Sequence, residues 1–296
     1  MSVIVITGCS SGFGLLAAKS FASRGDHVFA TLRHIDSKNR AVAAQLRAHA
    51  QAVGLKLEVV ELDVTSDASV EAAAAHIVRQ AGAPDVVINN AGQMFVGLGE
   101  AFTGAEVALQ LDINVVGLHR VTRAFLPTMR AKGSGLFINI SSVAGRFAVP
   151  FFSVYHASKW AVEGYSLGLR RELACTGVDV VVVEPGPFTT ELFPHAPKPA
   201  DADGRGKTYP QVAHDTFAGM GAAFEGMFKN PDVPTDPELV VARFLELAAM
   251  KAGTRPFRSP VGVDLGVIER NRADEALDGP FLDAMGLTAF AKLKTG

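Results

Sequence analysis

Three residues in the middle of the chain have side chains that could together move a proton. Ser142 is followed thirteen residues later by Tyr155, and Lys159 lies four positions beyond the tyrosine. A helix would place Tyr155 and Lys159 side by side on one face. A phenol with a pKa near ~10 is a poor proton carrier at neutral pH, whereas a neighbouring ammonium stabilises its phenolate and lowers that pKa. The three residues are therefore a candidate general acid/base site, with Ser142 placed to hold a substrate oxygen.

The segment that carries the pair is predicted to be helical. It is rich in good helix formers, and no proline interrupts residues 154–174. A tyrosine and a lysine at this spacing nevertheless arise by chance on many exposed helices. Taken alone, the pair is more typical of a solvated helix face than of an active site, so the elements around it must decide.

The composition indicates one large globular domain without a nucleic-acid surface. The chain has 296 residues, 48% of them hydrophobic, and 29 glycines, which suffices for a sizeable core. Its 28 basic and 30 acidic residues are interspersed, so no basic stripe is available for a phosphate backbone. The two cysteines, Cys9 and Cys175, have no metal-ligand spacing and predict neither a metal site nor a disulfide framework.

The N-terminal residues begin a strand rather than a targeting segment. No basic region followed by a long apolar run precedes the first glycine turn. Apolar runs elsewhere stay far short of the ~20 residues that a membrane span needs. We therefore expect a cytoplasmic protein, in a reducing compartment, that has no membrane partner.

A glycine-rich loop follows the first predicted strand. Residues 3–7 are short, β-branched and non-alternating, as in a buried parallel strand. The sequence Thr7-Gly8-Cys9-Ser10-Ser11-Gly12-Phe13-Gly14 comes next, and a helical pattern then runs to Arg24-Gly25. Strand, glycine turn and helix together present free backbone N–H groups to a pyrophosphate. A glycine loop alone is often only a tight turn, and this spacing departs from the common Gly-x-Gly-x-x-Gly fingerprint, but the flanking elements favour a dinucleotide site.

The end of the second predicted strand, residues 27–32, bears on the choice of dinucleotide. An NAD enzyme is expected to carry an acidic residue about 20 positions beyond the loop, for the ribose 2′-hydroxyl. Here the chain has Leu32 and Arg33 instead. An arginine can bind a 2′-phosphate, so NADP(H) is the preferred cofactor and NAD(H) is possible. The alternative is that Arg33 is an ordinary solvated residue.

Polar residues follow the next two predicted strands as well. Asp63 ends the strand of residues 55–62, where it could accept from the adenine amino group or instead cap the helix that begins near Ser66. The sequence is equally compatible with both roles. Asn90-Ala91-Gly92 follows the strand of residues 86–89. The carboxyl ends of parallel strands are where open sheets bind their ligands.

These motifs occur in an order that resembles one family. In chain order they are Gly8-x-x-x-Gly12-x-Gly14, Asn89-Asn90-Ala91-Gly92, Asn114, Ser142, Tyr155-x-x-x-Lys159 and Pro185-Gly186. Over about residues 3–192 the chain resembles the single-domain short-chain dehydrogenase/reductase family. Four segments are similar to its 17β-hydroxysteroid and retinol dehydrogenase branch: Thr7-Gly8-Cys9-Ser10-Ser11-Gly12, Ala30-Thr31-Leu32-Arg33, Arg123-Ala124-Phe125-Leu126-Pro127 and Val154-Tyr155. Motifs on the cofactor side say little about substrate.

The resemblance implies a role for each matching residue. Tyr155 would be the general acid/base, Lys159 would lower its pKa and hold the nicotinamide ribose, and Ser142 would polarise the carbonyl. Asn114, the fourth implied catalytic residue, would hold a water that links Lys159 to solvent. Thr190 and Phe188 would bind the carboxamide. The implied cofactor-binding set is Gly8, Ser10, Ser11, Gly12, Phe13, Gly14, Arg33, Asp63, Val64, Asn90, Ala91, Gly92, Tyr155, Lys159, Pro185, Gly186, Phe188 and Thr190.

The strand pattern and the resemblance together predict the architecture. We expect an α/β fold with a Rossmann-type doubly wound parallel sheet of about seven strands, helices on both faces, and a single domain over residues 1–296. Residues 1–140 would form the cofactor half, and 141–296 the catalytic and substrate half. Prolines and glycines interrupt residues 191–237, which predicts a lid with a helix at 211–228. The tail beyond Asp264 is predicted to be helical and packed.

Further expectations concern the substrate side and the assembly. His156, one residue past Tyr155, should point away from the chemistry and be structural.

Within the family, two long helices, predicted here at 104–130 and 154–174, commonly form an interface, which implies a homodimer or homotetramer. Six apolar residues are candidates to face substrate, although a plain core role is equally open for each: Met94, Phe95, Phe147, Phe151, Phe152 and Phe193.

The sequence thus predicts an NADP(H)-dependent oxidoreductase. Hydride would pass between the nicotinamide and a carbonyl or secondary alcohol of a largely hydrophobic small molecule, with Tyr155 as the general acid/base. The alternatives are an NAD(P)-binding regulator without catalysis and an NAD-preferring dehydrogenase of a small polar alcohol. An epimerase or dehydratase of the extended branch is disfavoured, because such chains have a different glycine spacing and a larger C-terminal domain.

Overall fold

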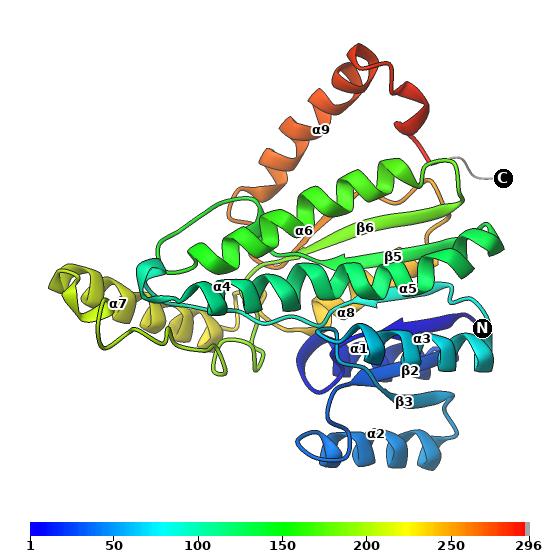
Figure 1. The fold of residues 1–296 in the computed structure, drawn as a ribbon, viewed down its shortest axis with the longest axis horizontal. Helices are drawn as coiled ribbons and strands as arrows, with labels where there is room; N and C mark the ends of the chain where they lie inside the picture. The colour runs from blue at the N-terminus through cyan, green and yellow to red at the C-terminus, as the bar shows by residue number, and fades with distance from the viewer. Residues whose placement is uncertain (294–296) are drawn as a thin grey trace.

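Seven parallel strands form one central sheet in the computed structural model, which describes residues 1–293 (Figure 1). Their order across the sheet is β3-β2-β1-β4-β5-β6-β7, so the direction of winding reverses between β1 and β4. This order confirms the predicted doubly wound architecture. The strands are β1 (Val3–Ile6), β2 (His27–Leu32), β3 (Leu57–Glu61), β4 (Val86–Asn89), β5 (Gly135–Ile140), β6 (Val178–Pro185) and β7 (Arg258–Val261).

Helices cover both faces of the sheet, as predicted. Successive strand side chains point to opposite faces, so Ile4 and Ile6 of β1 join one core cluster and Val5 joins the other. The first cluster packs against α1, α2 and α8, and the second against α3, α5 and α6. These helices are α1 (Gly12–Ser23), α2 (Arg40–Val53), α3 (Asp67–Ala81), α5 (Gly117–Lys132), α6 (Ser153–Glu172) and α8 (Glu238–Ala249).

The helix predicted at residues 104–130 is interrupted. It consists of α4 (Gly104–Leu111), a π turn at Asp112–Val116 and then α5. A π turn inserts an extra residue into the helical ladder and is frequent at functional sites. The candidate residue Asn114 lies within it.

Two helices lie outside the layered body. The predicted lid helix is present as α7 (Gln211–Lys229), which has no buried residue and extends from one end of the molecule (Figure 1). The predicted tail helix is α9 (Val267–Ala284), but its packing was predicted wrongly for much of its surface. Leu277, Phe281 and Met285 are 69%, 57% and 60% exposed, whereas Val267 and Asn271 are buried. Among the residues that the structure describes, no helix is both long and apolar enough to cross a bilayer.

Candidate active site

A cavity of about 930 Å³ opens at the carboxyl ends of the strands, beside the point where the winding reverses. The loops after β1, β2, β3, β4, β5 and β6 line it, and α7 contributes its outer wall. Crevices at such switch points are the usual ligand sites of open parallel sheets. Of the predicted cofactor-binding residues, all except Gly14 line this cavity.

The glycine loop after β1 has a shape that larger residues could not adopt. Gly8 and Gly12 have φ angles of +73° and +54°. A Cβ atom on Gly14 would lie 2.5 Å from both Asn90 Nδ2 and the Gly8 carbonyl oxygen. Ser11 precedes α1 without a side-chain capping bond, so the first N–H groups of that helix point toward the cavity unshielded. This cradle fits a dinucleotide pyrophosphate.

Hydrogen bonds tie the loop after β1 to the loop after β4. Thr7 Oγ1 accepts from the backbone N–H groups of Asn90 (3.0 Å) and Ala91 (2.9 Å). Asn90 Nδ2 donates to the carbonyl oxygens of Thr7 (2.8 Å) and Gly8 (3.2 Å). Asn90 therefore fixes the glycine loop directly, a role that the sequence did not predict for it.

The structure excludes one of the two predicted roles of Asp63, and the adenine contact stays a prediction. Ser66 caps α3, since its side chain accepts from the Ser69 N–H, so a capping role for Asp63 is wrong. Asp63 Oδ1 instead accepts from Thr65 N (2.9 Å) and Thr65 Oγ1 (2.8 Å), and the residue lines the cavity near Arg33. Burial opposes ionisation of Asp63, but the Thr65 hydrogen bonds and the charge of Arg33 outweigh it and lower its pKa.

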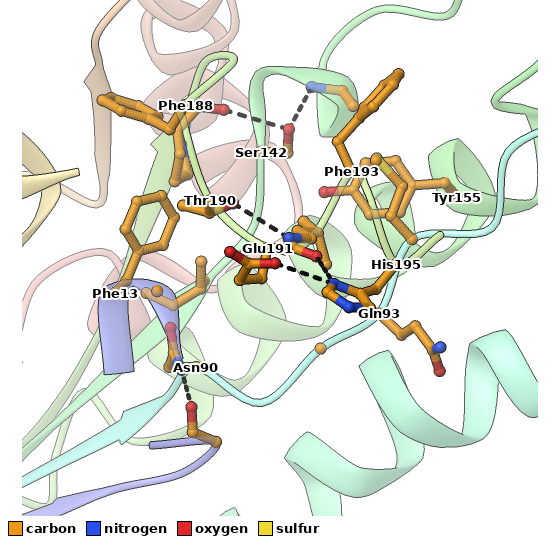
Figure 2. A pocket seen from close by; sticks show the side chains of 18 of the residues that line it. Phe13, Asn90, Gln93, Ser142, Tyr155, Phe188, Thr190, Glu191, Phe193 and His195 are labelled. Carbon is orange, nitrogen blue, oxygen red and sulfur yellow. Dashed lines mark hydrogen bonds and ion pairs between the residues drawn. The ribbon is translucent and has the colours of Figure 1, made fainter. Parts of the chain in front are cut away.

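Tyr155, Lys159 and Ser142 all line the cavity, and Figure 2 shows the side chains of Tyr155 and Ser142. Tyr155 and Lys159 are both buried in the first two turns of α6, and Lys159 Nζ lies 5.6 Å from the centroid of the phenol ring. Lys159 Nζ donates to the Ile140 carbonyl oxygen at 2.8 Å, which fixes the ammonium under the end of β5. Ser142 follows β5, and its hydroxyl donates to the Pro185 carbonyl oxygen at 3.2 Å.

The predicted lowering of the tyrosine pKa is wrong in this structure. Burial raises the pKa of Tyr155 to about 12, and a hydrogen bond with Ser142 offsets only part of the effect. Burial also lowers the pKa of Lys159 to about 8, against the opposing charge of Glu163. Both shifts have one cause: removing a charged group from water disfavours the phenolate and the ammonium alike.

Asn114 holds the loop after β4 against α6. Its Oδ1 accepts from Gln93 N (2.9 Å), and its Nδ2 donates to Gln93 O (2.9 Å) and Ser158 Oγ (3.0 Å). A Cβ atom on Gly92 would lie 3.4 Å from Asn114 Oδ1 and 3.9 Å from Lys159 Nζ, so these groups converge. The water relay through Asn114 stays a prediction.

The segment after β6 closes over the glycine loop. Phe188 is buried and packs edge-on against Phe13, with ring centroids 5.5 Å apart. Thr190 accepts from the Leu192 N–H, and its side chain lies 3.7 Å from the position of a Cβ on Gly12. Phe188 and Thr190 therefore lie beside the glycine loop (Figure 2), and their contact with the carboxamide stays a prediction.

Aromatic and methionine side chains form the other end of the cavity. Four of the predicted substrate-facing residues line it: Met94, Phe147, Phe152 and Phe193. The other two do not, because Phe95 packs in a separate cluster with Phe102, and Phe151 packs against Phe217 of α7. The sequence predicted a lid helix here but did not name the α7 residues that reach the cavity, for which the helical spacing of its apolar residues was the available signal. The α7 residues that line the cavity are Met220, Ala223, Phe224, Met227 and Phe228.

Two further residues hold loops that flank the site, and the first supports the turn of residues 143–146, here called the catalytic turn. The ring of His156 hydrogen-bonds the Ala144 carbonyl through Nδ1 (2.7 Å), and its Nε2 accepts from the Val149 N–H (2.9 Å). Both nitrogens are engaged in holding the segment after Ser142, which agrees with the predicted structural role. Gln110, which was not predicted, holds Phe95 N (2.8 Å) and Gln93 O (2.8 Å) on the opposite wall.

Comparison with known proteins identifies this arrangement. The family model described as short chain dehydrogenase matches residues 2–200. The chain belongs to this family. It is an oxidoreductase that acts on hydroxyl or keto groups with a nicotinamide cofactor.

Several relatives are similar to the enzyme. Rat estradiol 17-beta-dehydrogenase 1 is 34% identical over 296 residues, covering 99% of this chain and 83% of the rat protein. The 3-ketodihydrosphingosine reductase of Bacteroides thetaiotaomicron is 38% identical over 188 residues, which span 64% of each chain. Among solved structures, a short-chain dehydrogenase from Streptomyces avermitilis is 30% identical with a TM-score of 0.71, covering 97% of this chain and 98% of its own. A gluconate 5-dehydrogenase from Burkholderia cenocepacia in complex with NADP and tartrate is also 30% identical, with a TM-score of 0.59 over 64% of this chain and 73% of its own.

Proposed function

We propose that this enzyme is an NADP(H)-dependent ketone reductase or alcohol dehydrogenase for a largely hydrophobic small molecule. The observation that carries the proposal is the position of Tyr155. Its side chain packs in an apolar cluster with Phe152, Phe193 and Phe224, and it lines the same cavity as the glycine loop. A carbonyl bound in the apolar end would reach the phenol and the nicotinamide side at once.

Different residues of the cavity would bind different parts of the cofactor. The glycine cradle would hold the pyrophosphate, Asp63 the adenine end, and Phe188 and Thr190 the carboxamide. Arg33 lines the cavity at the adenosine end, where its guanidinium would pair with a 2′-phosphate. This placement supports NADP(H) over NAD(H), and the absence of an acidic residue at the end of β2 agrees with it. When bound, the nicotinamide supplies the hydride.

Three side chains would together protonate and polarise the substrate oxygen. With a pKa of about 12, Tyr155 stays protonated at neutral pH and is suited to donate its proton during carbonyl reduction. Ser142 would turn its hydroxyl from the Pro185 carbonyl toward the substrate oxygen and polarise it. The Lys159 ammonium would hold the nicotinamide ribose and stabilise the phenolate left after proton transfer.

The apolar end of the cavity supports a hydrophobic substrate over a small polar alcohol. Phe193 and Phe224 lie with ring centroids 5.2 Å apart, and Phe152 contacts the same ring of Phe224 at 6.4 Å. Such tilted and edge-on rings bury apolar area and leave few partners for a hydroxyl-rich molecule. Both the 17-beta-dehydrogenase and the 3-ketodihydrosphingosine reductase relatives are named for substrates with large apolar frames.

One screen tests the proposal. NADPH oxidation would be followed at pH 7 with a panel of aromatic ketones, steroids, retinoids, long-chain ketones and sugars. We expect turnover with at least one apolar ketone and little with sugars. Binding of NADPH without turnover across the panel would instead support a non-catalytic regulator, and turnover confined to small polar alcohols with NAD would support the other alternative.

We also propose that the enzyme is a homodimer or homotetramer. Apolar side chains on the α4–α5 segment and on α6 are exposed: Leu109 by 45%, Val116 by 40% and Trp160 by 46%. Burying them between copies would remove this apolar surface from water. Light scattering at micromolar concentration would give two or four times the chain mass, and a monomer would contradict the proposal.

A further inference from the structure

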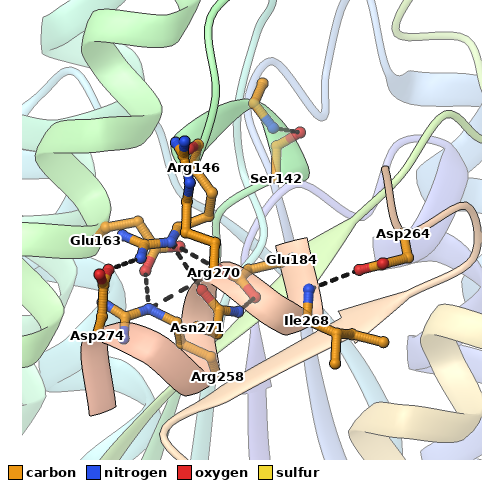
Figure 3. Close-up of polar contacts among 11 residues, drawn as sticks. Ser142, Arg146, Glu163, Glu184, Arg258, Asp264, Ile268, Arg270, Asn271 and Asp274 are labelled. Carbon is orange, nitrogen blue, oxygen red and sulfur yellow. Dashed lines mark hydrogen bonds and ion pairs between the residues drawn. The ribbon is translucent and has the colours of Figure 1, made fainter. Parts of the chain in front are cut away.

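A buried ionic network lies near Ser142 (Figure 3). It joins Glu163 of α6, Glu184 of β6, Arg258 of β7 and Arg146 of the catalytic turn. The four side chains are only 4%, 0%, 5% and 7% exposed. Asn271 of α9 is buried with them.

Hydrogen bonds and ion pairs connect the side chains of the network into one continuous chain of contacts. Arg258 Nε lies 2.9 Å from Glu163 Oε2 and 3.8 Å from Glu184 Oε1. Arg146 Nε donates to Asn271 Oδ1 at 2.8 Å and lies 3.9 Å from Glu184 Oε1. Asn271 Nδ2 donates to Glu184 Oε2 at 2.6 Å. The partly exposed Asp274 pairs with Arg146, so α9 closes the network from outside.

Stability alone does not account for this network. Burying ion pairs often contributes less to stability than well-packed apolar residues of the same volume. Here two carboxylates share one arginine, and burial together with the charge of Glu163 raises the pKa of Glu184.

The network touches the active site at two places. Glu163 follows Lys159 by one helical turn, and its charge supports the ammonium against the effect of burial. Gly145 of the catalytic turn packs so closely that a Cβ there would lie 2.7 Å from Ser141 Oγ, 3.1 Å from Glu163 Cγ and 3.2 Å from the Lys159 carbonyl oxygen. Any shift of Glu163 would therefore reach both Lys159 and the turn that follows Ser142.

We propose that Glu163 is a positioning residue that maintains the charge of Lys159, and that Asn271 of α9 supports it indirectly, through Glu184 and then Arg258. This inference rests on the proposed function of Lys159. The charged groups that face Glu163 are Lys159 on its own helix, Arg258 from β7, Glu184 from β6 and Arg146 from the catalytic turn. Glu163 would offset part of the positive charge of the two arginines and so keep the ammonium protonated during turnover.

The test compares the pH dependence of kcat for NADPH-linked ketone reduction between variants. Removing the negative charge in Glu163→Gln should move the alkaline limb of the profile down by about one pH unit, because a nearby opposite charge shifts a pKa by that order. Asn271→Ala leaves both carboxylates in place. It should move the alkaline limb to lower pH by about half as much as Glu163→Gln does. Glu163→Asp, which restores the charge, should return the limb most of the way. Glu172→Gln, an exposed glutamate on the same helix, is the matched control and should leave the profile unchanged.

Thermal melting separates positioning from loss of fold. A folded Glu163→Gln variant with the wild-type alkaline limb would overturn the inference while leaving the proposed function intact. If that variant does not fold, Asn271→Ala decides, and a wild-type alkaline limb in the folded Asn271→Ala variant would overturn the inference. Absence of turnover in the wild-type enzyme would remove the proposed function and this inference together.

Discussion

Replacing Gly14 with alanine tests the glycine cradle more sharply than any other single change. An alanine in a helix is normally more stable than glycine by about 0.5–1 kcal/mol. At position 14, however, the new methyl group would lie 2.5 Å from Asn90 Nδ2 and from the Gly8 carbonyl oxygen. The second of these contacts is backbone, which cannot rotate away.

The expected magnitude follows from these two opposing effects. Forcing a methylene into a packed site costs about 1–3 kcal/mol, so the net loss of unfolding free energy should be about 1–2 kcal/mol. For a chain of this size that corresponds to a melting temperature lower by about 2–5 °C. Displacing Gly8 and Asn90 also widens the pyrophosphate cradle, so the Kd for NADPH should rise at least about tenfold.

Gly219→Ala is the matched control. Gly219 is an exposed glycine within α7, and nothing lies within 4 Å of the position of its Cβ. Its melting temperature should equal or slightly exceed that of the wild type, with an unchanged Kd. Thermal melting and titration of NADPH fluorescence measure both quantities for both variants. If Gly14→Ala bound NADPH as tightly as Gly219→Ala, the assignment of this loop to the pyrophosphate would be refuted.

Three further predictions concern the chemistry. Tyr155→Phe removes only the hydroxyl and should lower kcat by a factor of about 10²–10⁴ with the Kd for NADPH nearly unchanged, as stopped-flow and fluorescence titration would measure; full activity would contradict the proton-donor role. Arg33→Ala should weaken NADPH by about tenfold and NADH much less, and equal effects in parallel titrations would argue against contact with the 2′-phosphate. The rate of ketone reduction should fall as pH rises through about 8, because Lys159 loses its charge there while Tyr155, with a pKa of about 12, keeps its proton. A rate that stays constant from pH 7 to 10 would contradict this assignment.

Local patterns predicted the sheet and most of the site. The strands are short apolar runs, and the glycine loop, Asn90, Ser142 and the Tyr155–Lys159 spacing each depend on residues close together in sequence. The parallel order of the sheet then brings the ends of those strands to one edge. That is why predicted residues from several distant segments line one cavity.

Features that depend on burial or on distant contacts were missed. The Tyr155 pKa was predicted in the wrong direction, because a spacing on a helix reveals the neighbouring ammonium but not the loss of solvent. The role of Asn271 was invisible for a similar reason, since its partner Arg146 lies 125 residues away. The π turn at Asp112–Val116 also left no sequence signal that distinguishes it from an ordinary helix.

In this enzyme, helix α7 lines the cavity without belonging to the core of the sheet. None of its residues is buried, yet Met220, Phe224 and Phe228 form part of the wall that a substrate would meet. The two core clusters on the faces of the sheet contain no residue of α7, so substitutions along this helix should leave the sheet intact. Selectivity can in this way diversify at little structural cost while the reaction itself is preserved.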